Sequence, residues 1–160
     1  MSRQGNLALL EEPVAKALLQ STQPAHLAYV ARDGTPRVVP VWFHWTGRAL
    51  VVGSPPMSPK VQALTPTAPV AVSIDTATWP YQALQIRGAA RVDSVPGVAP
   101  EYALAAERYF GAERGKAWIA QIGAMFASMA RISVEPEWVG LLDFESRFPG
   151  AIEAVSSRRS

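Results

Sequence analysis

Two tight turns between three short apolar runs place the strongest constraint on how this chain can fold. Ala25 to Ala31 is apolar, Asp33-Gly34 is typical of a hairpin turn, and Arg37 to Trp45 is rich in valine and aromatic residues. Thr46-Gly47 turns the chain again before a third apolar run, Ala49 to Gly53. Two consecutive hairpins predict an antiparallel meander.

The rest of the chain alternates helical and extended patterns with no linker or repeat. Helical spacing runs from Leu7 to near Ser21, and the helix itself is expected to begin nearer Glu11, which places Pro13 in its first turn. Gly88 indicates a bulge or a close backbone approach. The other predicted elements are a helix from Lys60 to Leu64, strands Val70 to Asp75 and Gln82 to Val95, helices Pro100 to Phe110 and Glu113 to Met129, and strands Arg131 to Val134 and Trp138 to Phe144.

These elements predict a mainly β fold of six or seven mostly antiparallel strands with peripheral helices, which suits a closed or partly closed barrel. We interpret residues 1–160 as one domain with a core of about residues 7–144. Residues 145–160 are expected to form a tail. Its basic end, Ser157 to Ser160, is expected to be frayed and solvated.

The composition points to a partner subunit. The chain is 49% hydrophobic and only 18% charged, whereas about 25% is usual in soluble domains. A net charge of +2 gives no reason to expect nucleic-acid binding, and the absence of cysteine excludes disulfides and thiolate chemistry. No secretory signal or membrane-spanning run is evident, so the expected compartment is the cytoplasm.

No set of residues in the sequence forms a familiar catalytic motif. His26 and His44 lie in predicted strands without metal-ligand or triad spacing, and Glu11-Glu12 is expected on a helix surface. No glycine-rich phosphate loop is present. If the protein is an enzyme, its reactive group is therefore expected to belong to a bound cofactor.

Polar residues at strand ends and in one loop could hold the phosphate of such a cofactor. The cations are Arg37 and Lys60, and the hydroxyls are those of Thr35, Ser54 and Ser58. Ser58 is a plausible helix cap, and the helix that follows would add backbone N–H groups. The alternative is that both cations are ordinary surface residues.

Pro40 interrupts the strand that runs between these cations. A proline cannot donate to a strand ladder, so it indicates a sheet edge or an interruption in pairing. The neighbouring N–H groups could then face a flat heteroaromatic ring. A strand bulge without a ligand remains the alternative.

A third feature is the aromatic loop Trp79-Pro80-Tyr81, followed by Arg87 in the long strand. Large aromatic residues in loops are frequent at interfaces and over ligands. The alternative is that both rings fold back on the core.

Taken in order, these features resemble the pyridoxamine 5'-phosphate oxidase-like, FMN-binding split-barrel superfamily. The resemblance covers roughly Leu7 to Phe144. It rests on Asp33 to Trp45, with its proline-interrupted V-P-V-W-F strand, on Ser54, on Lys60 to Leu64 and on Val70 to Asp75. It implies a split β-barrel that pairs into a homodimer with a cofactor in each of two interface clefts.

The resemblance also implies roles for individual residues. It assigns phosphate and ribityl contacts to Arg37, Ser54 and Lys60. From the sequence pattern itself we count Ser58 as a further candidate cofactor-binding residue. The wall beside the flavin ring would be formed by Val39, Pro40, Val41 and Trp42, while Trp79 and Tyr81 would reach in from the second subunit. Arg87, which follows these aromatic residues in the sequence, is counted as a further candidate cofactor-binding residue.

The implied activity is hydride transfer between FMN and a small organic substrate, with no catalytic residue identified. Coenzyme F-420 is the alternative cofactor, since the chain is similar to flavin and deazaflavin oxidoreductases. The loop before Lys60 lacks an extra arginine that some deazaflavin binders carry, and Ala63 stands where asparagine is frequent. A non-catalytic module that binds flavin or haem, with His44 as a haem ligand, stays open.

Overall fold

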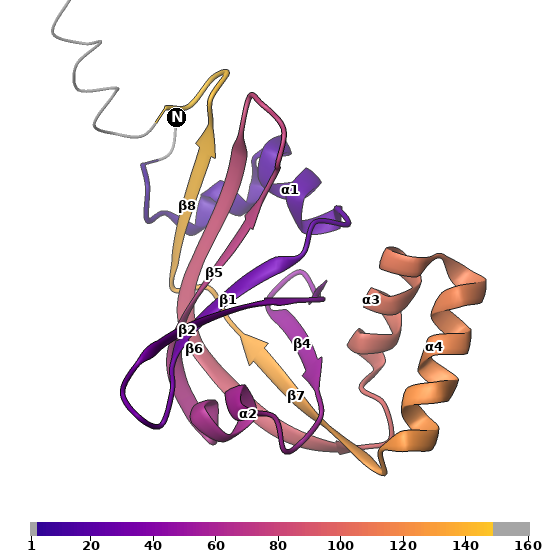
Figure 1. Ribbon diagram of the computed structural model, residues 1–160. Coiled ribbons are helices and arrows are strands. Elements are labelled where there is room, and N and C mark those ends of the chain that lie inside the picture. Colours follow the sequence, from indigo (N-terminus) through magenta and orange to yellow (C-terminus); the bar gives the residue numbers. More distant parts are fainter. Residues whose placement is uncertain (1–2, 149–160) are drawn as a thin grey trace, which may run out of the picture.

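The computed structural model describes residues 3–148 (Figure 1). Its helical elements are a 3-10 helix η1 (Leu7–Glu11) and four α-helices, α1 (Pro13–Gln20), α2 (Pro59–Leu64), α3 (Pro100–Phe110) and α4 (Ala112–Met125). The strands are β1 (Ala25–Val30), β2 (Pro36–Val41), β3 (His44–Trp45), β4 (Leu50–Ser54), β5 (Thr67–Asp75), β6 (Gln82–Pro96), β7 (Ser128–Val134) and β8 (Trp138–Asp143). The basic end at 157–160 lies outside the described residues.

All eight strands belong to one antiparallel sheet that does not close on itself. The order is β2-β1-β5-β6-β7-β4-β3, and β8 pairs with β6 beside this path. The mainly β, split-barrel fold expected from the sequence is confirmed. Figure 1 shows the sheet coiled around its interior, with α2 at one end and α1 near the other.

The long strand β6 pairs with two different strands along one edge, which divides the barrel into two halves. One of its edges pairs with β8 through residues 82–87 and then with β7 through residues 90–96. The changeover falls at Gly88, where an added Cβ would lie 2.2 Å from the Glu135 carbonyl oxygen. The predicted close backbone approach at Gly88 is therefore confirmed.

The interior of the coiled sheet holds the main core. Strand alternation directs large aliphatic side chains inward from both halves of the sheet, and α2 contributes one at its end. The fully buried members are Leu27, Leu50, Val52, Leu64, Ile74, Leu84, Ile86 and Ile132. This continuous core fixes the ends of β2 and β4, which carry the candidate site.

The prediction of one continuous strand from Arg37 to Trp45 is wrong. The structure divides it into β2, which pairs with β1, and the short β3, which pairs with β4. Trp42 and Phe43 lie between them. Phe43 is fully buried and its carbonyl oxygen accepts a hydrogen bond from Arg108, so the chain changes partners here instead of continuing one ladder.

The predicted helix from Glu113 to Met129 is also too long. The structure ends α4 at Met125 and starts β7 at Ser128, because Met129 is needed in the β6–β7 ladder opposite Val95. Figure 1 shows α3 and α4 as an antiparallel pair beside β4 and β7. Three apolar residues of α4, Trp118, Ile119 and Ile122, and Phe126 just after the helix are only partly buried.

Within residues 3–148, no helix combines the length and the apolar character needed to cross a membrane.

Candidate functional site

The end of β4 and the loop after it bring three of the predicted site residues together. Ser54 is the last residue of β4 and is 1% exposed. Its Oγ lies 2.9 Å from the Oγ of Ser58, four residues later. Lys60 follows in the first turn of α2. The loop therefore collects two hydroxyl groups and a cation in a short length of chain.

Lys60 has no carboxylate partner among the described residues. Its side chain is partly buried, and this burial lowers the pKa of Lys60 from its usual value because the charged form loses hydration. A partly buried ammonium group without a counter-charge is unfavourable unless an anion joins it. Lys60 is therefore a candidate ligand for an anion.

Ser58 stands at the N-cap position of α2, as the sequence predicts, but its side chain does not cap the helix. The hydroxyl contacts Ser54 instead. Because α2 has only six residues, its end adds little to any attraction for an anion. The expected contribution from the helix is therefore minor, and the side chains carry the site.

Arg37 is held within its own hairpin. Its guanidinium lies 3.0 Å from the Asp33 carboxylate and also donates to the Thr35 hydroxyl. Hydrogen bonds from Thr35, followed by the charge of Arg37, lower the pKa of Asp33. Arg37 therefore already has an anionic partner, unlike Lys60.

Sequence reasoning did not single out Arg32 on the same hairpin. Its Nε donates to the backbone carbonyl oxygen of Gln62 in α2 over 3.3 Å. This contact holds the hairpin tip against the helix that carries Lys60. The only feature of the sequence that could have indicated this contact is the position of Arg32 directly before the Asp33-Gly34 turn.

β2 is the terminal strand of the sheet, so its outer edge has no partner strand among the described residues. Pro40 lies in it opposite His26 and is exposed, which confirms that the proline marks a sheet edge. Val39 is partly buried and Val41 is 9% exposed, packed against the core. The unpaired backbone groups of β2 are free to bind a ligand.

Trp42 has a structural role that the sequence did not predict. Its ring stacks on Tyr109, with centroids 5.1 Å apart, and meets Phe110 edge to face. Tyr102 and Trp118 lie close by, with centroids 6.1 and 6.3 Å from that of Trp42. We call these five residues the aromatic cluster. It joins the end of β2 to the α3–α4 pair.

Trp79 and Tyr81 are exposed, at 67% and 45%, in the loop between β5 and β6. They pack on each other and on Phe144, with centroids 5.4 to 6.2 Å apart. β5 separates this loop from α2 along its whole length, which is about 25 Å for a strand of this size. Within one chain, the structure does not bring Trp79 and Tyr81 to Lys60.

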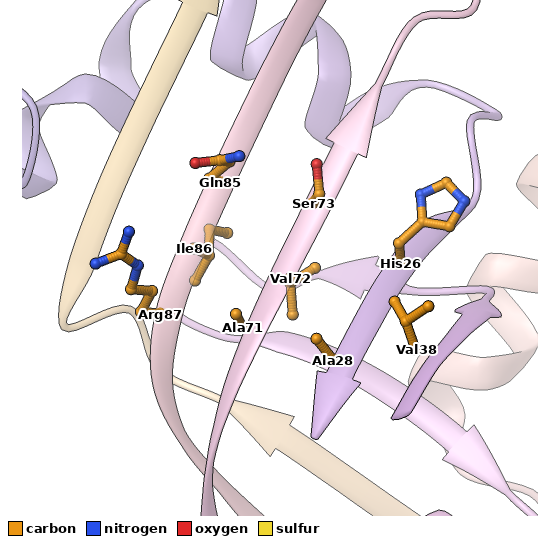
Figure 2. Close-up of a pocket in the computed structure, with 9 residues that line it drawn as sticks. All are labelled: His26, Ala28, Val38, Ala71, Val72, Ser73, Gln85, Ile86 and Arg87. Atoms are coloured by element: carbon orange, nitrogen blue, oxygen red, sulfur yellow. The ribbon is translucent and has the colours of Figure 1, made fainter. Parts of the chain in front are cut away.

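Arg87 lies on the outward face of the sheet, in a hollow of about 240 Å³ across β1, β2, β5 and β6 (Figure 2). Its guanidinium lies over the Trp138 ring, 3.8 Å from the centroid. His26 in the same hollow has its Nδ1 3.5 Å from Asp75. The exposed Val38 lines the hollow as well. Arg87 therefore does not join Ser54 and Lys60 within one chain.

His44 is partly buried in β3. Burial lowers its pKa from 6.5, the charge of Arg108 lowers the pKa further, and Glu101 acts in the opposite direction. The imidazole is therefore mostly neutral at pH 7. Across residues 3–148 no cluster of three metal-ligating side chains occurs. A role of His44 as a haem ligand stays a prediction.

The fold and this site define a class of protein: an open antiparallel split barrel whose fourth strand is followed by a loop with two hydroxyl groups and a lysine. The chain belongs to the pyridoxamine 5'-phosphate oxidase family, whose profile matches residues 12–143. No curated protein matches the sequence significantly.

Several solved structures share the fold. One named F420 reductase is 28% identical, with a TM-score of 0.58, over 78% of this chain and 94% of its own. A conserved hypothetical protein from Mycobacterium tuberculosis is 17% identical, with a TM-score of 0.64, over 89% and 91% of the two chains. A heme storage protein from Vibrio cholerae is 18% identical, with a TM-score of 0.58, over 82% and 93%.

Proposed function

We propose that the protein binds FMN and acts as a flavin-dependent oxidoreductase on a small organic substrate. The proposal is carried by Lys60, which is partly buried and has no carboxylate partner within residues 3–148, and by the Ser54–Ser58 hydroxyl pair beside it in the chain. A phosphate group would supply the missing negative charge.

Like Lys60, the Ser54–Ser58 hydroxyl pair could donate a hydrogen bond to a phosphate. When one of two hydrogen-bonded hydroxyls donates to the other, the second keeps a free O–H donor. Lys60 adds up to three N–H donors as a compact charge. Charge-assisted hydrogen bonds of this kind are about twice as strong as neutral ones. Arg37 would contribute only after releasing part of its contact with Asp33.

The outer edge of β2 is the proposed position of the flavin ring. Its backbone N–H and C=O groups beside Pro40 have no partner strand in the part of the chain that the structure describes, and a flat heterocycle with acceptor atoms on its edge would complement them. When bound, FMN would supply the two-electron chemistry. The chain itself would orient the ring, hold the phosphate and keep water from one face of the site.

We further propose that the protein is a homodimer and that the outward sheet face with Val38 and Arg87 is the contact surface. Val38 is 65% exposed and Trp79 is 67% exposed, and burying these side chains against a second subunit would remove their apolar surface from water. A second subunit would cover both and would bring Trp79, Tyr81 and Arg87 toward the site of the first.

The dimer is tested by Val38→Lys, which places a charge in the proposed contact. Sedimentation equilibrium should show a dimer for the unmodified protein and a monomer for the variant. Leu104→Lys is the control, since Leu104 is 51% exposed on α3, away from this face. A monomer in both proteins, or a dimer that Val38→Lys leaves intact, contradicts the proposed contact.

Coenzyme F-420 is the second candidate cofactor. The similarity to a structure named F420 reductase favours it, at 28% identity over most of both chains. Like FMN, the deazaflavin carries a phosphate that Lys60 could bind. The two candidates are separated by titrating the purified protein with each cofactor under the same conditions.

The phosphate site is tested by comparing FMN with riboflavin, which has the same ring but no phosphate. Lys60→Met keeps the length of the side chain and removes its charge. We expect FMN affinity to fall at least about tenfold, because a hydrogen bond to a charged group contributes roughly 1.5–3 kcal/mol. Riboflavin affinity should change by no more than about twofold, because riboflavin has no phosphate and so makes no charged hydrogen bond with Lys60.

Lys116→Met is the matched control, because Lys116 is exposed on α4. If FMN binds no more tightly than riboflavin to the unmodified protein, Lys60 is not a phosphate ligand. If neither FMN nor F-420 binds, the proposed function is wrong.

A further inference from the structure

A second hollow lies between the α3–α4 pair and strands β4 and β7. Its volume is about 160 Å³, and no charged side chain lines it. We call it the α3–α4 hollow. Its main walls are Ser54, Tyr102, Trp118, Ile122, Phe126 and Met129.

The size of the hollow restricts what it can hold. Drug-sized ligands and cofactors occupy roughly 300–1,000 Å³, so a flavin does not fit. An apolar cavity of about 150 Å³ in a protein interior accepts a single benzene ring. A charged molecule would lose its hydration here without gaining a counter-charge. The occupant that fits is a neutral molecule about the size of one ring.

The Tyr102 hydroxyl is a polar group in the walls that is available to a ligand. The Trp118 Nε1–H donates to the Tyr102 hydroxyl oxygen over 3.0 Å. The hydroxyl's own proton has no acceptor among residues 3–148. A ring that carries a carbonyl or a similar oxygen could accept it, which adds a preference for a ligand with one hydrogen-bond acceptor.

The packing of α4 shows that the protein itself does not fill the space. Gly115 is the one residue of this helix that is buried in the described structure, where an added Cβ would lie 2.8 Å from the Glu107 Cα of α3. This close contact holds α3 and α4 together near their connection at Gly111. Further along, Trp118 and Ile122 of α4 and Phe126 just after it line the hollow and remain partly exposed.

Two contacts connect the hollow with the proposed cofactor site. Trp42, at the end of the strand proposed to face the flavin ring, lies against Tyr102 and Trp118 with centroids 6.1 and 6.3 Å away. Ser54 lines the hollow and contacts Ser58 of the phosphate loop. The hollow is therefore about one side chain away from both ends of that site.

We propose that the α3–α4 hollow binds a neutral, single-ring molecule with one hydrogen-bond acceptor, and that this ring belongs to the substrate. The role as substrate site rests on the proposed flavin function. The binding of the ring does not, so the two can fail separately.

Three small probes test the binding on cofactor-free protein: acetophenone, toluene and benzoate. They share the ring and differ in having a neutral acceptor, no acceptor or a negative charge. We expect acetophenone to shift the Trp118 indole N–H signal in NMR titrations. Toluene should bind about fivefold more weakly, the effect of one ordinary hydrogen bond, and benzoate should not bind measurably.

Ile122→Trp fills the hollow and should weaken acetophenone binding at least tenfold. Met125→Trp is the matched control on the same helix, because Met125 is 62% exposed and does not line the hollow. Tyr102→Phe should weaken acetophenone about fivefold and leave toluene unchanged. FMN affinity should stay within twofold in all three variants. Should Ile122→Trp fail to fold, Tyr102→Phe still decides the role of the hydroxyl.

The substrate role has its own readout. Acetophenone added to FMN-loaded protein should change the visible absorption bands of the flavin, and Ile122→Trp should abolish this change. If FMN binds but acetophenone does not shift Trp118, or if benzoate binds as well as acetophenone, the inferred site is overturned and the proposed function stands. If acetophenone binds but leaves the flavin spectrum unchanged, the role as substrate site is overturned.

Discussion

The Trp42 ring stacks on the Tyr109 ring with centroids 5.1 Å apart and planes inclined by 7°. Tyr109 is in turn fixed by its hydroxyl, which donates to the Gln23 carbonyl oxygen over 2.8 Å. The neighbouring Arg108 donates to the Ser21 and Phe43 carbonyl oxygens. This end of α3 is thus attached both to the chain after α1 and to the chain after β2.

Removal of the stacked ring should therefore destabilise the whole protein. We expect Trp42→Ala to lower the free energy of unfolding by about 3–5 kcal/mol, the usual cost of deleting a large packed aromatic ring. Leu104→Ala on the exposed side of α3 should cost less than about 1 kcal/mol. Urea denaturation measures both. A loss below 1 kcal/mol in Trp42→Ala would show that the aromatic cluster contributes little to stability.

Gly88 is the position where β6 changes partner, and it should not tolerate any side chain. An alanine Cβ would lie 2.2 Å from the Glu135 carbonyl oxygen, which is backbone and cannot move aside without displacing β8. We expect Gly88→Ala to cost about 3 kcal/mol or more, at the upper end of overpacking effects. Thermal unfolding followed by circular dichroism measures the change.

The control for this substitution is Gly123→Ala in α4. There the new Cβ would meet only Val98, at an ordinary contact distance of 3.7 Å. Alanine is the better helix former, so this variant should be more stable by about 0.5–1 kcal/mol. If the two glycine variants behave alike, the close approach at Gly88 has no energetic consequence.

The ion pair between Glu101 of α3 and Arg131 of β7 should matter more than the surface pairs. The closest N–O distance is 2.5 Å and the side chains are only 17% and 27% exposed. Glu101 also has a buried Oε2 with no hydrogen-bond partner within the described part of the chain. We expect Arg131→Met to cost about 3 kcal/mol, since it leaves a poorly hydrated carboxylate unpaired. Arg48→Met, which breaks the exposed pair with Glu135, should cost less than about 1 kcal/mol.

The same pair predicts a pH dependence. Hydrogen bonds from Arg131 lower the pKa of Glu101 in the folded state from 4.5. Stabilisation from a lowered carboxyl pKa is fully present above the unfolded value and is lost as the pH falls through the folded value. The difference in melting temperature between the unmodified protein and Arg131→Met should therefore be largest above pH 4.5 and shrink below it. A difference that stays constant on acidification contradicts this assignment.

Most strands and turns were predictable because each depends on local pattern. Asp33-Gly34 forms the expected hairpin turn, with Gly34 at φ 80°, and Pro13 stands at the first position of α1. The division between β2 and β3 was not predictable, since nothing in the local sequence shows that Phe43 is buried under α3. The end of α4 was missed for a similar reason. Helical periodicity runs on to Met129, but strand pairing with β6 determines where the helix stops.

The candidate site was predictable only in part. The proximity of Ser54, Ser58 and Lys60 follows from a short loop between a strand and a helix, so the sequence alone placed them together. The state of each cation depends on distant or unforeseen neighbours. Arg37 has an acid partner within its own turn, whereas Lys60 has none in the described structure. The α3–α4 hollow has walls from four elements and left no signal in the sequence.

The lowered pKa of Lys60 leads to a last prediction, on the pH dependence of cofactor binding. Burial favours the neutral amine, so Lys60 should lose its proton below its usual pKa of 10.5. A bound phosphate needs the charged form. The ratio of FMN affinity to riboflavin affinity should therefore fall as the pH rises toward 10.5, and the comparison with riboflavin cancels any titration of the flavin ring itself. Lys60→Arg keeps its charge throughout this range and should hold the ratio nearly constant. Isothermal titration calorimetry measures both affinities, and a ratio that falls equally in the two proteins would mean that another group controls phosphate binding.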